Sequence, residues 1–283
     1  MRHYCTLFDS KYLPQGLALY DSLVKHSSER FALWVLAMDA ECSTALRQLA
    51  LPYVRVVDRY WFEQQASFGI KLGQTHQEYC WACASVFTSY LMTICEDDDY
   101  DTFDAFTYLD ADCYFYSNPK VIFDEIADRS IAVIPHRLIP SKKHLEVNGM
   151  FNVSLVYFKN TPTGRKCLST WSLQCRERCS AKVGCGDQKY LDEWPAKYGD
   201  ELCVIQNIGA GLAPWNFAHY RITEGPKADG NDVVFVHYHE YVHGQRLTNY
   251  ELRDEDVKYI YAPYFAAVSR AQETVASTIH LQA

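Results

Sequence analysis

Several features that would assign a protein to a class at once are missing from this sequence. No run of about 18 apolar residues occurs, so no membrane-spanning helix is expected. The net charge is −8, which leaves no broad basic field for nucleic acid. No Gly-x-Gly-x-x-Gly follows the first predicted strand and no Walker motif is present, so neither a dinucleotide-binding fold nor a P-loop enzyme is supported.

The amino-terminal segment lacks the apolar stretch of a secretory signal and leads directly into a predicted strand. The eleven cysteines are scattered without a small-scaffold pattern, so we interpret them as reduced thiols. We therefore expect a cytoplasmic protein. With 283 residues, 48% of them hydrophobic, the chain suits one large α/β domain or a domain and a half.

An acidic pair stands in the middle of the chain, directly after a predicted buried strand. Residues 105–109 are mostly apolar or aromatic, and Asp110 and Asp112 follow them. In an open α/β sheet, ligands collect beyond the carboxyl ends of the strands. Two carboxylates there can hold a divalent cation and leave most of its coordination sphere to a diphosphate and water. A solvated turn is the simpler alternative, but the apolar strand that feeds into the pair favours a metal site.

Apolar runs and helical periodicity alternate along the chain and predict an α/β fold with a parallel sheet and right-handed crossovers. The polar segment 138–149 is expected to be a flexible loop over a site. The predicted strands are 3–8, 31–37, 54–57, 105–109, 130–135, 151–159, 202–206 and 232–238. The predicted helices are 16–26, 42–51, 77–95, 121–127 and 163–178, with another beginning near 187 and a polar, helical segment from about 245.

The order of short motifs resembles the GT-A glycosyltransferases and is most similar to glycosyltransferase family 8. The resemblance implies an α/β, Rossmann-like nucleotide-diphospho-sugar transferase fold, with a mixed, mostly parallel sheet flanked by helices. It also implies a catalytic domain over 1–245 and a helical extension over 246–283. The motifs are Phe8-Asp9-x-x-Tyr12, Leu109-Asp110-Ala111-Asp112, Asn152, Gly186-Asp187-Gln188, Trp215-Asn216 and a last strand that ends in His237.

The resemblance implies that Asp110 and Asp112 coordinate Mn²⁺ or Mg²⁺ bridging the diphosphate of the donor. The leaving group is a nucleoside diphosphate, so a cation that neutralises its charge supplies Lewis-acid catalysis. His237 stands where the family has its third ligand, and an imidazole suits Mn²⁺ better than Mg²⁺. A buried structural histidine is the alternative for His237, and His239 is its rival on the same strand face.

The same resemblance implies a donor site. Tyr12 would stack on the nucleobase, with Phe8 and Asp9 beside it for the base or ribose. Ala111 and Asn152 would contact the donor as well.

Asp187 and Gln188 are the implied catalytic residues. Asp187 would position or stabilise the oxocarbenium-like centre, although a plain helix cap is its alternative role. Lys189 replaces the acid that usually follows, so that position's role does not transfer. Trp215 and Asn216 would also bind ligand, on the acceptor side together with Arg137. Relatives often have a lysine that binds the diphosphate, and His243 or Arg246 would take its place here.

The sequence therefore predicts a metal-dependent hexosyltransferase that moves a sugar from a nucleotide-sugar, a UDP-sugar rather than a GDP-sugar, to a glycan or glycolipid hydroxyl. The resemblance favours surface polysaccharide synthesis with retention, but an inverting mechanism with Asp187 as the base stays open. No nucleic-acid partner is expected, and a lipid-linked acceptor would place the protein at the inner membrane face.

Two alternatives from other classes are weaker. A sugar-1-phosphate nucleotidyltransferase would show a glycine-rich basic loop near the amino terminus, and this chain has none. A non-catalytic nucleotide-sugar or glycan-binding module would tolerate loss of the metal ligands, yet all three are present.

Overall fold

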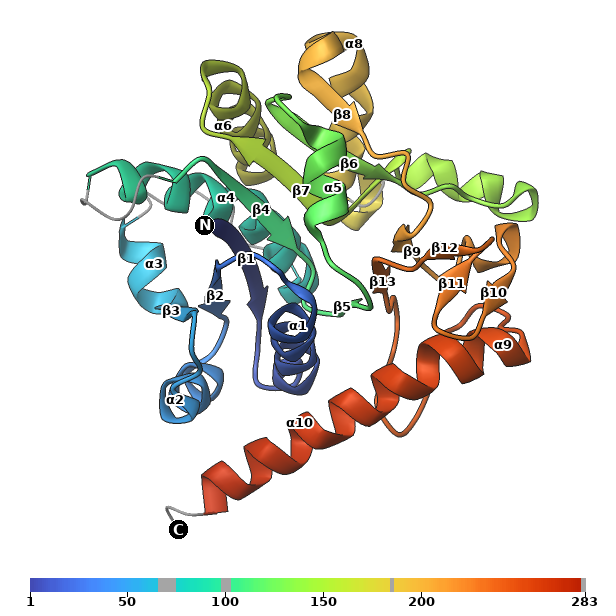
Figure 1. Ribbon diagram of the computed structural model, residues 1–283. Coiled ribbons are helices and arrows are strands. Elements are labelled where there is room, and N and C mark those ends of the chain that lie inside the picture. The colour runs from blue at the N-terminus through green and yellow to red at the C-terminus, as the bar shows by residue number, and fades with distance from the viewer. Residues whose placement is uncertain (66–74, 98–102, 184–185, 281–283) are drawn as a thin grey trace.

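A seven-stranded sheet with the order β3-β2-β1-β4-β7-β6-β8 runs through the middle of the molecule (Figure 1). The computed structural model describes residues 1–65, 75–97, 103–183 and 186–280. The strands of this sheet are β1 (Arg2–Phe8), β2 (Phe31–Ala37), β3 (Val54–Asp58), β4 (Ala105–Leu109), β6 (Ile131–Pro135), β7 (Phe151–Lys159) and β8 (Leu202–Val204).

The sheet is mixed, and most of its strands run the same way. β1 pairs in parallel with β2 and with β4, β2 pairs in parallel with β3, and β6 pairs in parallel with β8. β7 runs antiparallel to both β4 and β6. The predicted fold class, a mostly parallel mixed sheet flanked by helices, is confirmed.

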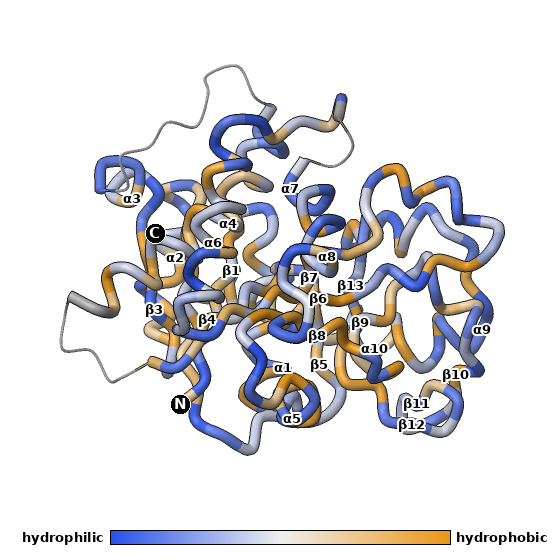
Figure 2. The backbone as a smooth tube through the Cα atoms, turned by 90° about the horizontal axis from the view of Figure 1, so that it is seen from above, coloured by the Kyte–Doolittle hydropathy of each residue, from blue (hydrophilic) through white to orange (hydrophobic). Residues whose placement is uncertain are grey.

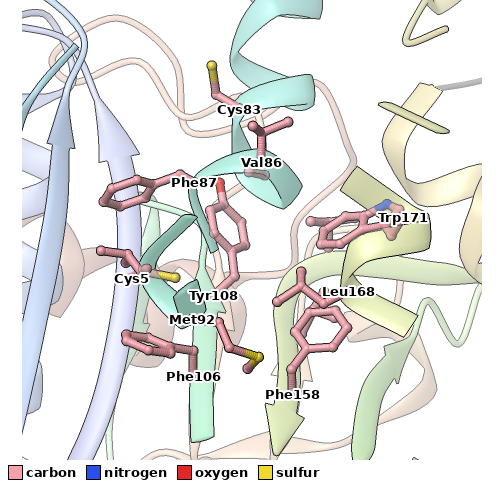
Figure 3. Packing of buried hydrophobic residues seen from close by; sticks show 14 of the residues in the cluster. Cys5, Cys83, Val86, Phe87, Met92, Phe106, Tyr108, Phe158, Leu168 and Trp171 are labelled. Atoms are coloured by element: carbon pink, nitrogen blue, oxygen red, sulfur yellow. The ribbon is translucent and has the colours of Figure 1, made fainter. Parts of the chain in front are cut away.

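Helices cover both faces of the sheet because the strands alternate buried side chains between two cores. On one face, α4 (His76–Asp97) and α6 (Pro162–Glu177) pack over Phe106 and Tyr108 of β4 and Phe158 of β7 (Figure 3). The other face is covered by α1 (Leu13–His26), α2 (Ala40–Leu49), α5 (Lys120–Ile126) and part of α10 (Ala262–His280). Figure 2 shows hydrophobic segments gathered around the central strands.

The remaining helical segments are short and lie between these elements. Among the described residues, no helix combines the length and the apolar character needed to cross a membrane. The short segments are α3 (Arg59–Gln65), α7 (Gly186–Lys189), α8 (Trp194–Tyr198) and α9 (Asp254–Asp256), the 3₁₀ turns at Ala181–Val183, Tyr190–Glu193, Gly199–Glu201 and Phe217–His219, and a π-helical turn at Val257–Tyr261.

A second sheet, ordered β5-β13-β9, lies beyond the end of β4. Its strands are β5 (Cys113–Phe115), β13 (Phe235–His237) and β9 (Ala210–Leu212), and a further small sheet joins β10 (Ile222–Thr223), β11 (Lys227–Ala228) and β12 (Asn231–Asp232). The predicted strand 232–238 is therefore wrong in its extent. It is split because Val233 bonds back to Pro226 while Val234 bonds to Gly209, which passes the chain from one sheet to the other.

Two other predicted elements differ from the structure. The strand predicted over 202–206 ends at Val204, because Gln206 and Asn207 donate their backbone N–H groups to Glu125 instead of to a ladder. The segment 138–149, predicted as a loop, forms 3₁₀ turns from Pro140 to Asn148. Proline at the first turn is compatible with such a start because its missing N–H needs no partner there.

The carboxyl-terminal helix α10 packs against the body of the protein through aromatic contacts. Tyr264 of this helix stacks on Tyr238, with ring centroids 3.6 Å apart. The Tyr238 hydroxyl donates a hydrogen bond of 2.9 Å to the carbonyl oxygen of Ile260. Figure 1 shows α10 passing along α1 at the lower side of the molecule. The division into a domain over 1–245 and an extension over 246–283 stays a prediction.

Substituting Gly16 in α1 tests the close approach of this helix to β1. A Cβ atom at Gly16 would lie 2.4 Å from Cε1 of Phe8, so Gly16→Ala forces a shift. We expect a loss of about 1–3 kcal/mol in the free energy of unfolding, measured by urea denaturation, despite the better helix propensity of alanine. The double variant with Phe8→Leu should show a favourable coupling energy, and strict additivity of the two changes would contradict this account.

Candidate functional site

Two carboxylates and one imidazole meet where β4 ends. Asp110 and Asp112 lie in the turn from β4 to β5, and His237 ends β13, opposite Cys113 of β5. The His237 Nε2 atom is 3.2 Å from Asp112 Oδ1 and 3.7 Å from Asp110 Oδ2. One ligand atom from each of the three residues lies within 4.8 Å of the other two. The pairing of β5 with β13 therefore brings together residues that are 125 positions apart in the sequence.

The charges of the three groups are compatible with a bound cation. Burial raises the pKa of Asp110 to about 6, against the opposing effect of His237. Burial also acts to raise the pKa of Asp112, but the charge and the hydrogen bond of His237 outweigh burial, so the pKa of Asp112 is lowered. The two carboxylates raise the pKa of His237 although burial opposes this. Two oxygen donors and one imidazole nitrogen are a ligand set that fits Mn²⁺, and a divalent ion would balance both carboxylates.

The predicted choice of His237 over His239 agrees with this geometry. His237 is 5% exposed and belongs to the group. The side chain of His239 is 43% exposed, and its Nε2 atom lies 4.0 Å from Glu240. Among the residues that the structure describes, His239 is not part of a three-ligand group.

Asn152 and His136 lie directly behind His237. The Asn152 Oδ1 atom is 3.1 Å from His237 Nδ1, and the Asn152 Nδ2 atom is 3.3 Å from His136 Nε2. Burial, chiefly, lowers the pKa of His136 to about 4, so its ring is neutral at physiological pH. Sequence reasoning placed Asn152 at the donor sugar and missed its contact with His237. For His136 the sequence offered only one signal, the polar pair His136-Arg137 directly after the predicted strand 130–135.

Asp187 is a buried carboxylate near the same centre. It is 5% exposed, and burial together with the charge of Asp110 raises its pKa well above the usual range. Its Oδ1 atom accepts a hydrogen bond of 2.8 Å from the backbone N–H of Gln188. The Gln188 side chain donates to the carbonyl oxygen of Asn148 at 2.9 Å, so it holds the segment Pro140–Asn148. A buried acid with few internal partners is typical of a functional position.

The residues predicted for the nucleobase differ in how accessible they are. Tyr12 is 44% exposed, and burial followed by the charge of Asp112 raises its pKa to about 12, so its ring lies near the acidic pair. Asp9 Oδ1 accepts from the N–H groups of Lys11 and Tyr12, and Asp9 Oδ2 lies 3.3 Å from His76 Nε2. His76 was not expected from the sequence.

Phe8 and Ala111 are buried in the hydrophobic core, at 4% and 7% exposure. Phe8 packs against Gly16, as the fold requires. A contact of either side chain with the donor stays a prediction.

Trp215 and Asn216 are buried and bonded to backbone. Asn216 donates to the carbonyl oxygens of His136 and Gly211, and its Oδ1 atom accepts from Ala213. The Trp215 indole donates to the carbonyl oxygen of His136 at 2.9 Å. The Trp215 ring also lies 5.4 Å from His237. Both side chains therefore support the centre, and a direct contact with ligand stays a prediction.

Arg137, His243 and Arg246 also have local partners. Arg137 adopts a left-handed backbone conformation with φ of 50°, and its half-buried guanidinium donates to the carbonyl oxygens of Asn207 and Ala210. His243 Nδ1 is 2.6 Å from the Tyr241 hydroxyl, and its Nε2 is 3.2 Å from Ser269. Arg246 is exposed and donates to the Glu240 carbonyl oxygen. Of the two predicted stand-ins for the lysine, Arg246 is therefore the more accessible.

Replacing Asp187 should make the protein more stable. Because the folded pKa lies above the unfolded value, the folded state binds more protons, and stability falls as pH rises above about 4. Asp187→Asn removes this cost and keeps an acceptor for the Gln188 N–H. We expect urea denaturation to show a higher free energy of unfolding than wild type at pH 8, and a smaller gain at pH 5.

Asp192→Asn is the matched control. Its two carboxylate oxygens accept from Met150 N–H and from Lys189 Nζ, at 2.7 and 2.8 Å. Losing this ion pair should lower stability by up to about 1 kcal/mol at pH 8. A destabilised Asp187→Asn variant at pH 8 would contradict the buried-charge interpretation.

Comparison with known proteins gives the fold and no established activity. No family model matches the chain. Two uncharacterised proteins of Bacillus subtilis strain 168 are each 26% identical. The alignment with YfnD extends over 283 residues and covers 95% of this chain and 89% of YfnD. The alignment with YfnF extends over 252 residues and covers 84% of this chain and 81% of YfnF.

Solved structures with the same architecture are glycosyltransferases. The galactosyltransferase LgtC, in complex with donor and acceptor sugar analogues, has a TM-score of 0.56 at 18% identity and covers 97% of this chain and 95% of its own. Mouse xyloside xylosyltransferase 1 has a TM-score of 0.55 at 11% identity, and the match covers 84% of this chain and 98% of that protein's chain. GlyE of Streptococcus pneumoniae TIGR4 has a TM-score of 0.54 at 16% identity, and the match covers 97% of this chain and 64% of the GlyE chain. The chain therefore has the fold of the GT-A glycosyltransferases.

Proposed function

We propose that this protein is a metal-dependent glycosyltransferase similar to family 8, which transfers a hexosyl group from a nucleotide-sugar to a hydroxyl of a glycan or glycolipid. One observation carries the proposal: Asp110, Asp112 and His237 converge at the carboxyl end of β4 in a GT-A fold. That edge of an α/β sheet is where nucleotides bind. The galactosyltransferase LgtC, which has the same architecture, forms a complex with donor and acceptor sugar analogues, and this supports the same class of substrates here.

The three ligands would hold Mn²⁺ or Mg²⁺ against the donor diphosphate. When bound, the cation neutralises the charge that develops on the nucleoside diphosphate as it leaves. Tyr12 presents its exposed phenol ring for stacking on the nucleobase, and the Asp9 carboxylate holds the turn that carries this ring. These roles place the base next to α1 and the diphosphate beside the acidic pair.

Asp187 is the residue proposed to act on the sugar. A carboxylate held in a buried place stabilises positive charge strongly, because little water screens the interaction. Asp187 would therefore favour the oxocarbenium-like centre as the bond to the diphosphate breaks. With retention, the acceptor hydroxyl attacks from the face that the diphosphate leaves, and the departing phosphate takes the proton.

The finer points of the proposal follow the family resemblance. The donor is a UDP-sugar, the product belongs to a surface polysaccharide, and a lipid-linked acceptor brings the protein to the inner membrane face. Trp215, Asn216 and Arg137 line the acceptor side, and they act by holding the backbone around His136 and Ala210.

The test is thermal stabilisation by UDP, GDP, CMP and dTDP, each with and without Mn²⁺. We expect UDP with Mn²⁺ to stabilise the wild type by about 2.7 kcal/mol at one hundred times the dissociation constant, because a ligand that binds only the folded state shifts unfolding. Asp110→Asn should lose the Mn²⁺-dependent part. Asp104→Asn, an exposed carboxylate at the opposite end of β4, should behave as wild type.

Slow release of UDP from UDP-hexoses, measured on the same samples, separates an enzyme from a binding module. Stabilisation without any turnover of donor would favour a binding module. Stabilisation by no nucleotide, in a folded sample, would contradict the proposal as a whole.

A further inference from the structure

The amide of Asn152 lies between two imidazole rings, and its orientation is fixed by a third group. The Asn152 Oδ1 atom accepts a hydrogen bond of 2.9 Å from the backbone N–H of Ser154. A backbone N–H can only donate, so the atom that faces it must be the amide oxygen. The same oxygen is 3.1 Å from His237 Nδ1, and the amide nitrogen therefore faces His136 Nε2 at 3.3 Å.

This orientation decides where the protons lie on both rings. His237 Nδ1 faces an acceptor and must carry hydrogen, so in the neutral ring the lone pair is on Nε2. His136 Nε2 faces an N–H donor and must be the acceptor, so the hydrogen of that ring is on Nδ1. The chain of bonds has one polarity from His237 to His136, and reversing any member would set two donors or two acceptors against each other.

We propose that His136 is a positioning residue for the metal centre: together with the Ser154 N–H it holds the amide of Asn152 in place. The amide in turn holds His237 with its Nε2 atom directed at the space beside the Asp110 and Asp112 carboxylates, where its lone pair would ligate a cation. The proposal rests on the proposed function, because it concerns the same centre. His136 touches neither carboxylate, and it acts through the amide. Groups that hold a ligating imidazole in this way typically contribute about 10–100-fold to metal affinity.

The surroundings of the two rings support this role. The Trp215 ring packs edge-on against both, with centroid distances of 5.3 Å to His136 and 5.4 Å to His237, which limits rotation of either ring. The four side chains of this group are buried, at 8% exposure or less: His136, Asn152, Trp215 and His237. A buried hydrogen-bonded chain is costly to break, because each unpaired group loses its partner without gaining water.

The sheet geometry explains how the members meet. The pairing of β6 with β7 shifts register between Val133 and Ile134, so that Ile134 lies opposite Asn152 while Val133 lies opposite Val156. Bulges of this kind redirect side chains. Here the irregularity contains both Asn152 and Ser154, whose N–H fixes the amide.

The test compares Mn²⁺ binding by His136→Leu, His136→Gln and wild type, with free Mn²⁺ measured by electron paramagnetic resonance. Leucine removes the acceptor, so we expect the affinity to fall by about 10–100-fold. Glutamine can place its carbonyl oxygen near the Nε2 position and should restore the affinity to within about threefold of wild type. The visible spectrum of bound Co²⁺ should change in the leucine variant and return in the glutamine variant.

His3→Leu is the matched control. His3 is also a buried histidine, 4% exposed, whose Nδ1 atom lies 3.4 Å from the indole nitrogen of Trp34. It stands near the amino end of β1, whereas the acidic pair follows the carboxyl end of the neighbouring strand β4. We expect this variant to lose stability but to bind Mn²⁺ as wild type does.

Wild-type affinity in His136→Leu would overturn the inference and leave the proposed function standing. An equal loss in the leucine and glutamine variants would also overturn it, since ring packing and not the acceptor would then matter. Failure of the wild type to bind Mn²⁺ would overturn both. If His136→Leu does not fold, Asn152→Leu gives the decision: wild-type Mn²⁺ affinity in this variant would overturn the inference, because the amide is the link through which His136 acts.

Discussion

Two carboxylates held side by side at the end of a buried strand form the constraint on which this molecule depends. Asp110 and Asp112 repel each other, and burial adds to the cost. His237 offsets part of this cost, but only because the second sheet pairs β13 with β5 and so brings the ring next to Asp112, 125 positions earlier in the chain. The nearby Asp187 is a third buried acid, and burial together with the charge of Asp110 raises its pKa. A site that costs this much in the folded protein supports the proposal that a cation binds there.

The sequence predicted the local part of this arrangement well. The strand 105–109 and the acidic pair after it are contiguous, so hydrophobic pattern alone located both. His237 was placed by family resemblance, because nothing near it in the sequence connects it with Asp110. The split of 232–238 into two short strands was not foreseen, since it depends on bonds from Val233 and Val234 to distant carbonyl groups.

The contacts of residues behind the centre were harder to predict than the meeting of Asp110, Asp112 and His237. Asn152, Trp215 and Asn216 were recognised as part of a motif set but were given contacts with substrate. In the structure their polar atoms bond to backbone and to histidine rings. A motif records that a residue is needed, whereas its partners depend on register and on the bulge between β6 and β7, which no local pattern reveals.

The direction of β7 has a consequence for the whole edge of the sheet. Parallel strands bring only their last residues to the side where ligands collect. β7 runs the other way, so it brings its first residues to that side, between the last residues of β4 and β6. Asn152 stands at the amino end of β7 and His136 just after the carboxyl end of β6. One reversed strand thus lets backbone leaving the sheet and backbone arriving in it meet beside the acidic pair.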